Sequence, residues 1–170
     1  MAVDGCPHAF QELAQTVLPQ YLAELRRRMV EPVPMATFAA PGAGPVTIAR
    51  GMGRRSDFSG CYVLMDEGAP FYVGISRTVL SRLRSHVLGR GHEDATLAYS
   101  MAYAARPHRM SRSQAMADPE FRSVFDEKRA HLKTVQAAFV EIDNAFEMHI
   151  FEAYCALELD TYVWNTFATH

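Results

Sequence analysis

The chain has 170 residues, enough for one domain whose apolar core needs neither a disulfide nor a metal to hold it. Apolar residues make up 49% and charged residues 21%, as in water-soluble globular proteins, and no apolar run approaches the length of a membrane span. The net charge of −2 argues against indiscriminate binding of nucleic acid.

The first expected element is an amphipathic helix over residues 10–30, where apolar residues recur at steps of three and four. Pro19 interrupts this pattern, which predicts a kink or two shorter helices. Prolines and glycines then dominate, so residues 31–58 are expected to be mostly loop, with one short strand near Val46–Ala49. We expect residues 1–58 to form an N-terminal segment packed on a domain of residues 59–170.

Two short β-rich stretches follow, at 60–65 and 70–75, and the turn residues between them predict a hairpin. Ser76 can cap a helix over residues 77–88, which ends at Gly89. Residues 93–105 and 112–133 are expected to be helical, residues 135–142 to form a third strand, and Asn144 with Glu147 to begin a last helix reaching Leu159 through a capping box.

These elements predict an α+β fold, with a small, mainly antiparallel three-stranded sheet flanked by helices. An N-terminal helix and a helical insert over residues 92–134 complete it. The three cysteines are odd in number and too widely spaced for a zinc site, so we expect reduced thiols in a cytoplasmic protein. No basic and apolar leader opens the sequence, so we expect it to be unprocessed.

Charge is distributed unevenly along the chain. Residues 49–116 contain ten arginines and five acidic residues, whereas residues 117–170 contain ten acidic residues and four lysines or arginines. No acidic residue occurs between Gly68 and His92. Such a basic stretch can bind a phosphate backbone, which makes Arg77, Arg84 and Arg90 candidate nucleic-acid contacts. A solvated helix face is the alternative.

The helix after the hairpin has an apolar stripe of Leu80, Leu83 and Val87. At about 100° per residue, Arg82 and His86 lie about 40° apart and point away from that stripe. We therefore expect this pair off the packed face of the helix.

Glu152 lies in an apolar run of the last helix, and no Lys or Arg lies three or four residues from it. A carboxylate among apolar neighbours must be exposed, protonated or paired with a cation. A bound Mg²⁺ ion would supply that cation, because it prefers carboxylate oxygens and needs few protein ligands.

The sequence Gly60-Cys61-Tyr62, followed by Tyr72-Val73-Gly74 with its tyrosine ten residues on, resembles the signature of the GIY-YIG nuclease superfamily. Cys61 and Val73 replace the central isoleucines of the two tripeptides. The resemblance continues through Arg82 and His86 on the following helix, Glu152 on a later helix, and Asn165 in the C-terminal segment.

The resemblance implies metal-dependent hydrolysis of DNA, with Mg²⁺ on Glu152 and Mn²⁺ as a substitute. It implies that Arg82 binds the scissile phosphate, that Tyr62 approaches the attacking water and that Tyr72 orients the phosphate or that water. Asn165 would fix the network by hydrogen bonds, and Gly74 would allow a close approach of backbone or substrate.

The general base is either Tyr62 or His86, and we expect the two to act together. The pKa of a free tyrosine is about 10, whereas that of a free histidine is about 6.5 and suits a base at neutral pH. A nucleic-acid-binding module of the same fold without catalysis is the alternative function. The N-terminal helix packs on the domain or forms a homodimer, and targeting to a particular DNA comes from the insert, the N-terminal segment or a separate protein.

Overall fold

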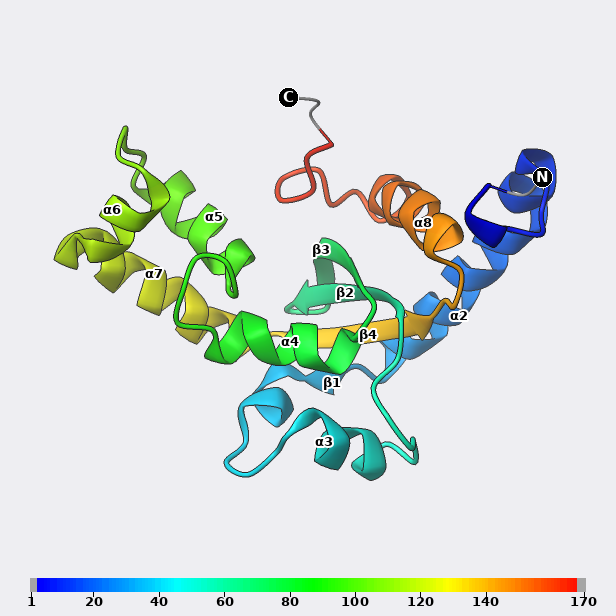
Figure 1. Cartoon of the computed structure of the whole chain (residues 1–170), viewed down its shortest axis with the longest axis horizontal. Helices are drawn as coiled ribbons and strands as arrows, with labels where there is room; N and C mark the ends of the chain where they lie inside the picture. Colours follow the sequence, from blue (N-terminus) through cyan, green and yellow to red (C-terminus); the bar gives the residue numbers. More distant parts are fainter. Residues whose placement is uncertain (1–2, 168–170) are drawn as a thin grey trace. The chain divides into compact units, whose positions relative to one another are not determined.

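The computed structural model describes residues 3–167, which form two compact units (Figure 1). The first unit contains the chain up to Val33, Asp57–Val79, and the chain from Gln136 onward. The second contains Pro34–Ser56 and Leu80–Val135. The sequence suggests a boundary between residues 58 and 59. The two units do not follow it, because the N-terminal helix groups with the hairpin strands in the first unit.

The sheet has four strands in the order β1-β4-β2-β3. Strand β2 (Gly60–Asp66) pairs antiparallel with the edge strand β3 (Ala69–Ser76) on one side and with β4 (Gln136–Glu141) on the other. The α+β class and the antiparallel sheet are confirmed, but the sequence predicts three strands. The fourth, β1 (Val33–Pro34), has only two residues, one of them a proline, too few to give an alternating pattern.

The turn of the β2–β3 hairpin consists of Glu67 and Gly68, both with positive φ values, of 49° and 83°. This geometry matches the right-handed twist of the paired strands, and glycine adopts it at little cost. The hairpin that the turn residues predict is therefore confirmed, with strand limits within a residue or so of those expected.

The N-terminal helix of the first unit has three parts: α1 (Phe10–Glu12), a π-helical turn η2 (Leu13–Val17) and α2 (Leu18–Val30). Pro19 lies in the first turn of α2, where its missing N–H costs least. The predicted interruption at Pro19 thus occurs as a change of helix type. The last helix, α8 (Ala145–Glu158), begins where Asn144 caps the backbone N–H of Glu147, and a short 3-10 turn η1 (Val3–Gly5) precedes α1.

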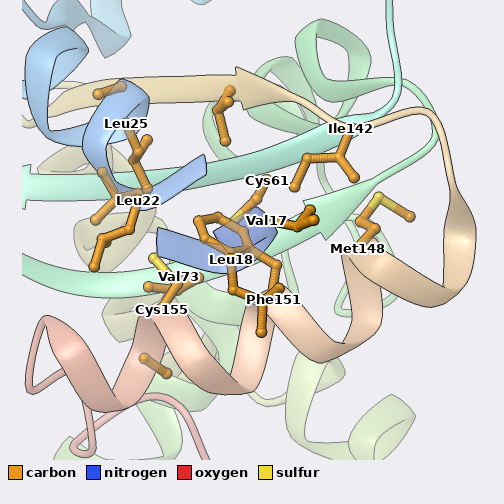
Figure 2. Close-up of a cluster of buried hydrophobic side chains, with 14 of the residues drawn as sticks. Val17, Leu18, Leu22, Leu25, Cys61, Val73, Ile142, Met148, Phe151 and Cys155 are labelled. Atoms are coloured by element: carbon orange, nitrogen blue, oxygen red, sulfur yellow. The ribbon is translucent and has the colours of Figure 1, made fainter. Parts of the chain in front are cut away.

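A buried apolar cluster joins α2 and α8 to one face of the sheet (Figure 2). Leu18, Leu22 and Leu25 come from α2, and they meet side chains of α8 such as Phe151. The strands contribute Cys61, Val63, Val73, Ala138 and Val140. The apolar stripe of the N-terminal helix is therefore buried within its own chain.

The second unit is mainly helical. A strand was predicted near Val46–Ala49, and this is wrong: these residues belong to helix α3 (Pro45–Gly51), which Pro45 begins because its fixed φ suits a first helical turn. The 3-10 turn η3 (Met35–Ala39) precedes α3. The other helices occur where they were expected: α4 (Val79–Leu88), whose first residue still belongs to the first unit, α5 (Thr96–Ala105), α6 (Arg112–Ala117) and α7 (Pro119–Leu132).

Within residues 3–167, no helix combines the length and the apolar character needed to cross a membrane.

Candidate functional site

Two tyrosines of the signature lie on neighbouring strands and face the same side of the sheet. Tyr62 is opposite Gly74 in the β2–β3 register, and Leu64 is opposite Tyr72. The centroids of the two tyrosine rings are 6.2 Å apart. Tyr62 is only 1% exposed, whereas Tyr72 is partly open to solvent. Of the pair, Tyr72 is therefore the one that a substrate can reach directly.

The glycine of each tripeptide is required by packing. A Cβ atom on Gly74 would overlap the Tyr62 hydroxyl and lie 2.5 Å from its Cζ atom, so Tyr62 crosses over the glycine of the other tripeptide. A Cβ on Gly60 would overlap the carbonyl oxygen of Val140 on β4. The close approach expected at Gly74 is thus made by the Tyr62 side chain.

Asn165 fastens the C-terminal segment to β3, the edge strand of the sheet. Its side-chain oxygen accepts a hydrogen bond from the backbone N–H of Val73 at 2.8 Å, and its amide nitrogen donates to the carbonyl oxygen of Val73 at 2.7 Å. Both outward-facing backbone groups of Val73 are satisfied in this way. Asn165 therefore fixes the strand position beside Tyr72.

Glu152 lies half-buried on α8, and burial raises the pKa of its carboxyl group while nearby His149 acts in the opposite direction. The described part of the chain provides it with neither a hydrogen bond nor an ion pair. Helix α8 packs on the face of the sheet lined by Cys61 and Val73, whereas Tyr62 faces the other side, so the structure does not bring Glu152 and Tyr62 together on one face.

Behind the hairpin, Cys61 of β2 and Cys155 of α8 are buried free thiols. Burial raises the pKa of the Cys61 thiol well above its usual value, and Cys155 and Glu152 raise it further. The Cys61 thiol therefore stays protonated, and Cys61 packs as a small apolar residue.

The residues that could hold a metal ion are few. No three His, Cys, Asp or Glu side chains gather into a metal site within residues 3–167. A single half-buried carboxylate such as Glu152 fits a cation that keeps most of its water ligands, and Mg²⁺ binds proteins in that way. The donor set therefore fits Mg²⁺ better than Zn²⁺, which takes three or four protein ligands.

In the second unit, Arg82 of α4 is fixed by two hydrogen bonds. One terminal nitrogen donates to the carbonyl oxygen of Asp94 at 2.9 Å, and the other donates to the hydroxyl of Thr96 at 2.6 Å. The guanidinium is partly exposed and has five N–H donors, so donors are left for an anionic ligand. Its orientation is set before any ligand binds.

His86 was expected beside Arg82 off the packed face, and this is wrong: the His86 side chain is completely buried. Burial, and secondarily the positive charge of Arg82, lower its pKa from 6.5 to about 3. At helical spacing, Arg82 and His86 lie about 40° apart around α4. This spacing could not show that the His86 side of α4 is buried as well.

The other arginines of the basic stretch differ in exposure. Arg77 and Arg90 are exposed. Arg84 is partly buried, and it donates to the carbonyl oxygen of Phe38 at 3.2 Å. Arg84 therefore has a structural partner within the second unit, which the charge pattern did not reveal.

Glu147 is a buried acid whose environment the sequence did not indicate. The predicted capping box is only half formed, because the Glu147 side chain turns away from the Asn144 backbone. Its carboxylate accepts a 2.9 Å hydrogen bond from the Tyr21 hydroxyl and lies 3.7 Å from the Cys6 sulfur and 3.8 Å from the His8 ring. Its partners lie more than 120 residues away in the sequence, and this distance explains why no local pattern reveals them.

No protein-family model, curated protein or solved structure matches this chain. The candidate residues are therefore interpreted from their own chemistry, unit by unit. In the first unit, partly exposed Tyr72 lies beside buried Tyr62 on one face of the sheet, and Glu152 has no ion pair among the described residues. In the second unit, the guanidinium of Arg82 is oriented by its bonds to Asp94 and Thr96.

Proposed function

We propose that this chain is a metal-dependent endonuclease of the GIY-YIG type, which hydrolyses phosphodiester bonds of DNA. The half-buried Glu152 carboxylate is the observation that carries this proposal. Desolvation without an ion pair or a hydrogen bond from residues 3–167 is unfavourable for a carboxylate, and a bound cation removes that cost. The resemblance of both tripeptides, Arg82 and Asn165 to the family supports it further.

Glu152 is the residue that would hold the ion. When bound, Mg²⁺, or Mn²⁺ in its place, supplies the positive charge that polarises the scissile phosphate and neutralises the leaving 3′-oxygen. A single carboxylate leaves the remaining coordination positions to water and to substrate oxygens. Activity should therefore depend steeply on metal concentration and be abolished by EDTA.

The tyrosines have different tasks in this proposal. Tyr72, which is partly exposed on the edge strand, orients the phosphate or the attacking water. Tyr62 is buried against Gly74, and in this proposal its hydroxyl approaches that water. Asn165 keeps β3 in place through its two bonds to Val73, so that Tyr72 is held in one position.

Arg82 binds the scissile phosphate and stabilises the additional charge of the transition state. Its bonds to Asp94 and Thr96 hold the guanidinium in place, so that little side-chain entropy is lost on binding. His86 receives no role in proton transfer, because a base with a pKa of about 3 is far from the operating pH. The joint action expected of Tyr62 and His86 is therefore replaced by Tyr62 alone.

Exposed Arg77 and Arg90 contact the DNA backbone without reading its sequence, so we propose that targeting depends on a separate protein or on the 92–134 insert. The apolar stripe of the N-terminal helix is used in the core of the first unit, so we propose that this helix stabilises the fold rather than a homodimer. We propose that the protein acts in the cytoplasm, where its three thiols stay reduced.

The test incubates the full chain with plasmid, branched and single-stranded DNA in Mg²⁺, Mn²⁺ or EDTA. The proposal predicts nicks or breaks with either metal, no product in EDTA, and no product from Glu152→Ala. Cleavage that survives both EDTA and Glu152→Ala contradicts it. Stable DNA binding without cleavage under any metal condition indicates the alternative, a nucleic-acid-binding module that lacks catalysis.

A further inference from the structure

The second unit contains an open pocket formed by α5, the loop after it and the start of α6. Its volume is about 410 Å³, which is within the range of small-molecule sites in proteins. Two arginines and no acidic residue line it. Its walls include Tyr99, Tyr103, His108, Arg109, Met110 and Arg112.

The inner wall of the pocket is fixed by contacts among its own side chains. Tyr99 is buried, and its hydroxyl lies 3.3 Å from Nε2 of His108. The His108 ring also meets the Phe121 ring nearly at a right angle, with centroids 4.8 Å apart. The Arg112 guanidinium lies 5.4 Å from the centroid of the Tyr99 ring. The wall is therefore formed without a ligand.

The outer part of the pocket exposes large side chains. Tyr103 is 45% exposed and Met110 is 41% exposed, and both belong to the same pocket. The Tyr103 ring is perpendicular to that of His108, with centroids 5.0 Å apart. A single exposed aromatic residue is ordinary, but here one lies beside a fixed imidazole and two guanidinium groups. This combination provides flat apolar surface and positive charge at one place.

We propose that this pocket binds an unpaired nucleotide of a single-stranded nucleic acid. The base stacks on Tyr103, and Arg109 and Arg112 bind the adjoining phosphates. Stacking on aromatic side chains within a positively charged groove is how proteins bind single strands without reading their sequence. An acidic peptide would satisfy the arginines but has no flat ring to cover Tyr103. The site is separate from Glu152 and does not depend on hydrolysis.

The test measures fluorescence anisotropy of a labelled oligothymidylate of about 12 nucleotides, a length typical of one binding domain. The full chain is used in EDTA, which prevents metal-dependent cleavage, so binding is read independently of the proposed nuclease activity. Tyr103→Ala should weaken binding by between about 5-fold and about 150-fold, the range for loss of one stacking ring. Tyr103→Phe should bind as the natural chain does, because stacking needs the ring and not the hydroxyl.

A second variant tests the charge. Arg109→Gln should weaken binding and reduce the slope of log affinity against log salt by about one. The matched controls are Tyr162→Ala, which removes a tyrosine that is 71% exposed in the first unit, and Arg50→Gln, which removes an exposed arginine on α3. Both controls should retain binding, and circular dichroism should show that all five variants are folded.

A single strand with one 5-iodo-deoxyuridine should crosslink to Tyr103 under ultraviolet light, as mapped by mass spectrometry. The same anisotropy measurement with a labelled oligouridylate distinguishes RNA from DNA. Tight binding of the oligothymidylate or of the oligouridylate supports the proposal. Unchanged affinity of Tyr103→Ala overturns it. Equal competition by a blunt duplex overturns the requirement for an unpaired base, and equal competition by polyglutamate overturns the requirement for any base.

Discussion

The glycines of the two tripeptides allow a quantitative test of the packing around Tyr62. In Gly74→Ala the new methyl group would lie 2.5 Å from Cζ of Tyr62, a side chain that is 1% exposed and has no room to move outward. In Gly60→Ala the methyl group would overlap the Val140 carbonyl oxygen, which is backbone of the paired strand β4. Relief at Gly60 therefore requires the β2–β4 pairing itself to shift.

Overpacking of this kind costs about 1–3 kcal/mol, and more where backbone must move. We predict that Gly74→Ala lowers the free energy of unfolding by an amount in that range. Gly60→Ala should lower it by about 3 kcal/mol or more. For a chain of this size each kcal/mol corresponds to a decrease of about 2–4 °C in Tm.

Urea unfolding followed by circular dichroism measures these differences. Gly51→Ala is the matched control, because a Cβ at that position meets no atom within 4 Å and the residue ends helix α3. Its effect should be neutral or slightly stabilising. Equal stability of Gly74→Ala and Gly51→Ala would contradict the close approach of Tyr62 to β3. It would also contradict the claim that packing requires a glycine at position 74.

Three further predictions concern buried ionisable groups. Folding raises the pKa of Glu152, so the stability that its carboxyl group provides is present at acidic pH and is lost as the pH rises above about 4.5. Glu152→Gln should therefore be at least as stable as the natural chain at pH 7 in metal-free buffer. A large loss of stability in this variant at pH 7 would contradict the prediction. Folding lowers the pKa of His86 from 6.5 to about 3, so the stability that the neutral ring provides is fully present above pH 6.5. It decreases as the pH falls toward 3, by at most about 1.4 kcal/mol per pH unit. His86→Gln should flatten this pH dependence in acid titrations followed by fluorescence, and it should leave the pH profile of cleavage above pH 6.5 unchanged. Tyr21→Phe removes the 2.9 Å donor to buried Glu147 and should cost about 1–3 kcal/mol in urea unfolding, whereas Tyr162→Phe, at an exposed position, should cost nothing measurable.

Local patterns in the sequence are sufficient for most of the secondary structure. The hairpin was predictable because its aromatic, β-rich strands and its Glu67-Gly68 turn are encoded within a few residues. Strand β1 was not, because its two residues, one of them a proline, carry no periodicity and pair with a strand about 100 residues later. Helix α3 was misread because the β-branched residues near Val46 suggest a strand, although Pro45 favours a helix start.

The placement of the two tyrosines was predictable from the sequence, but the burial of other candidate residues was not. The signature gave Tyr62 and Tyr72 on adjacent strands, which the register confirms. It did not give the burial of His86, because exposure depends on what packs against a helix from elsewhere in the chain. The Glu147 cluster and the Tyr103 pocket were missed for the same reason. In the sequence, the residues that form each of them resemble ordinary core residues.

The central claim is that Glu152 holds the metal ion of a nuclease, and single-turnover cleavage of labelled DNA in Mg²⁺ tests it most directly. Glu152→Gln removes the charge with little change in volume, and Glu158→Gln makes the same change at an exposed position on the same helix, where the carboxylate pairs with Arg26 at 3.7 Å. The account predicts that Glu152→Gln abolishes Mg²⁺-dependent cleavage while Glu158→Gln cleaves at the natural rate. Equal cleavage rates for the two variants would contradict it.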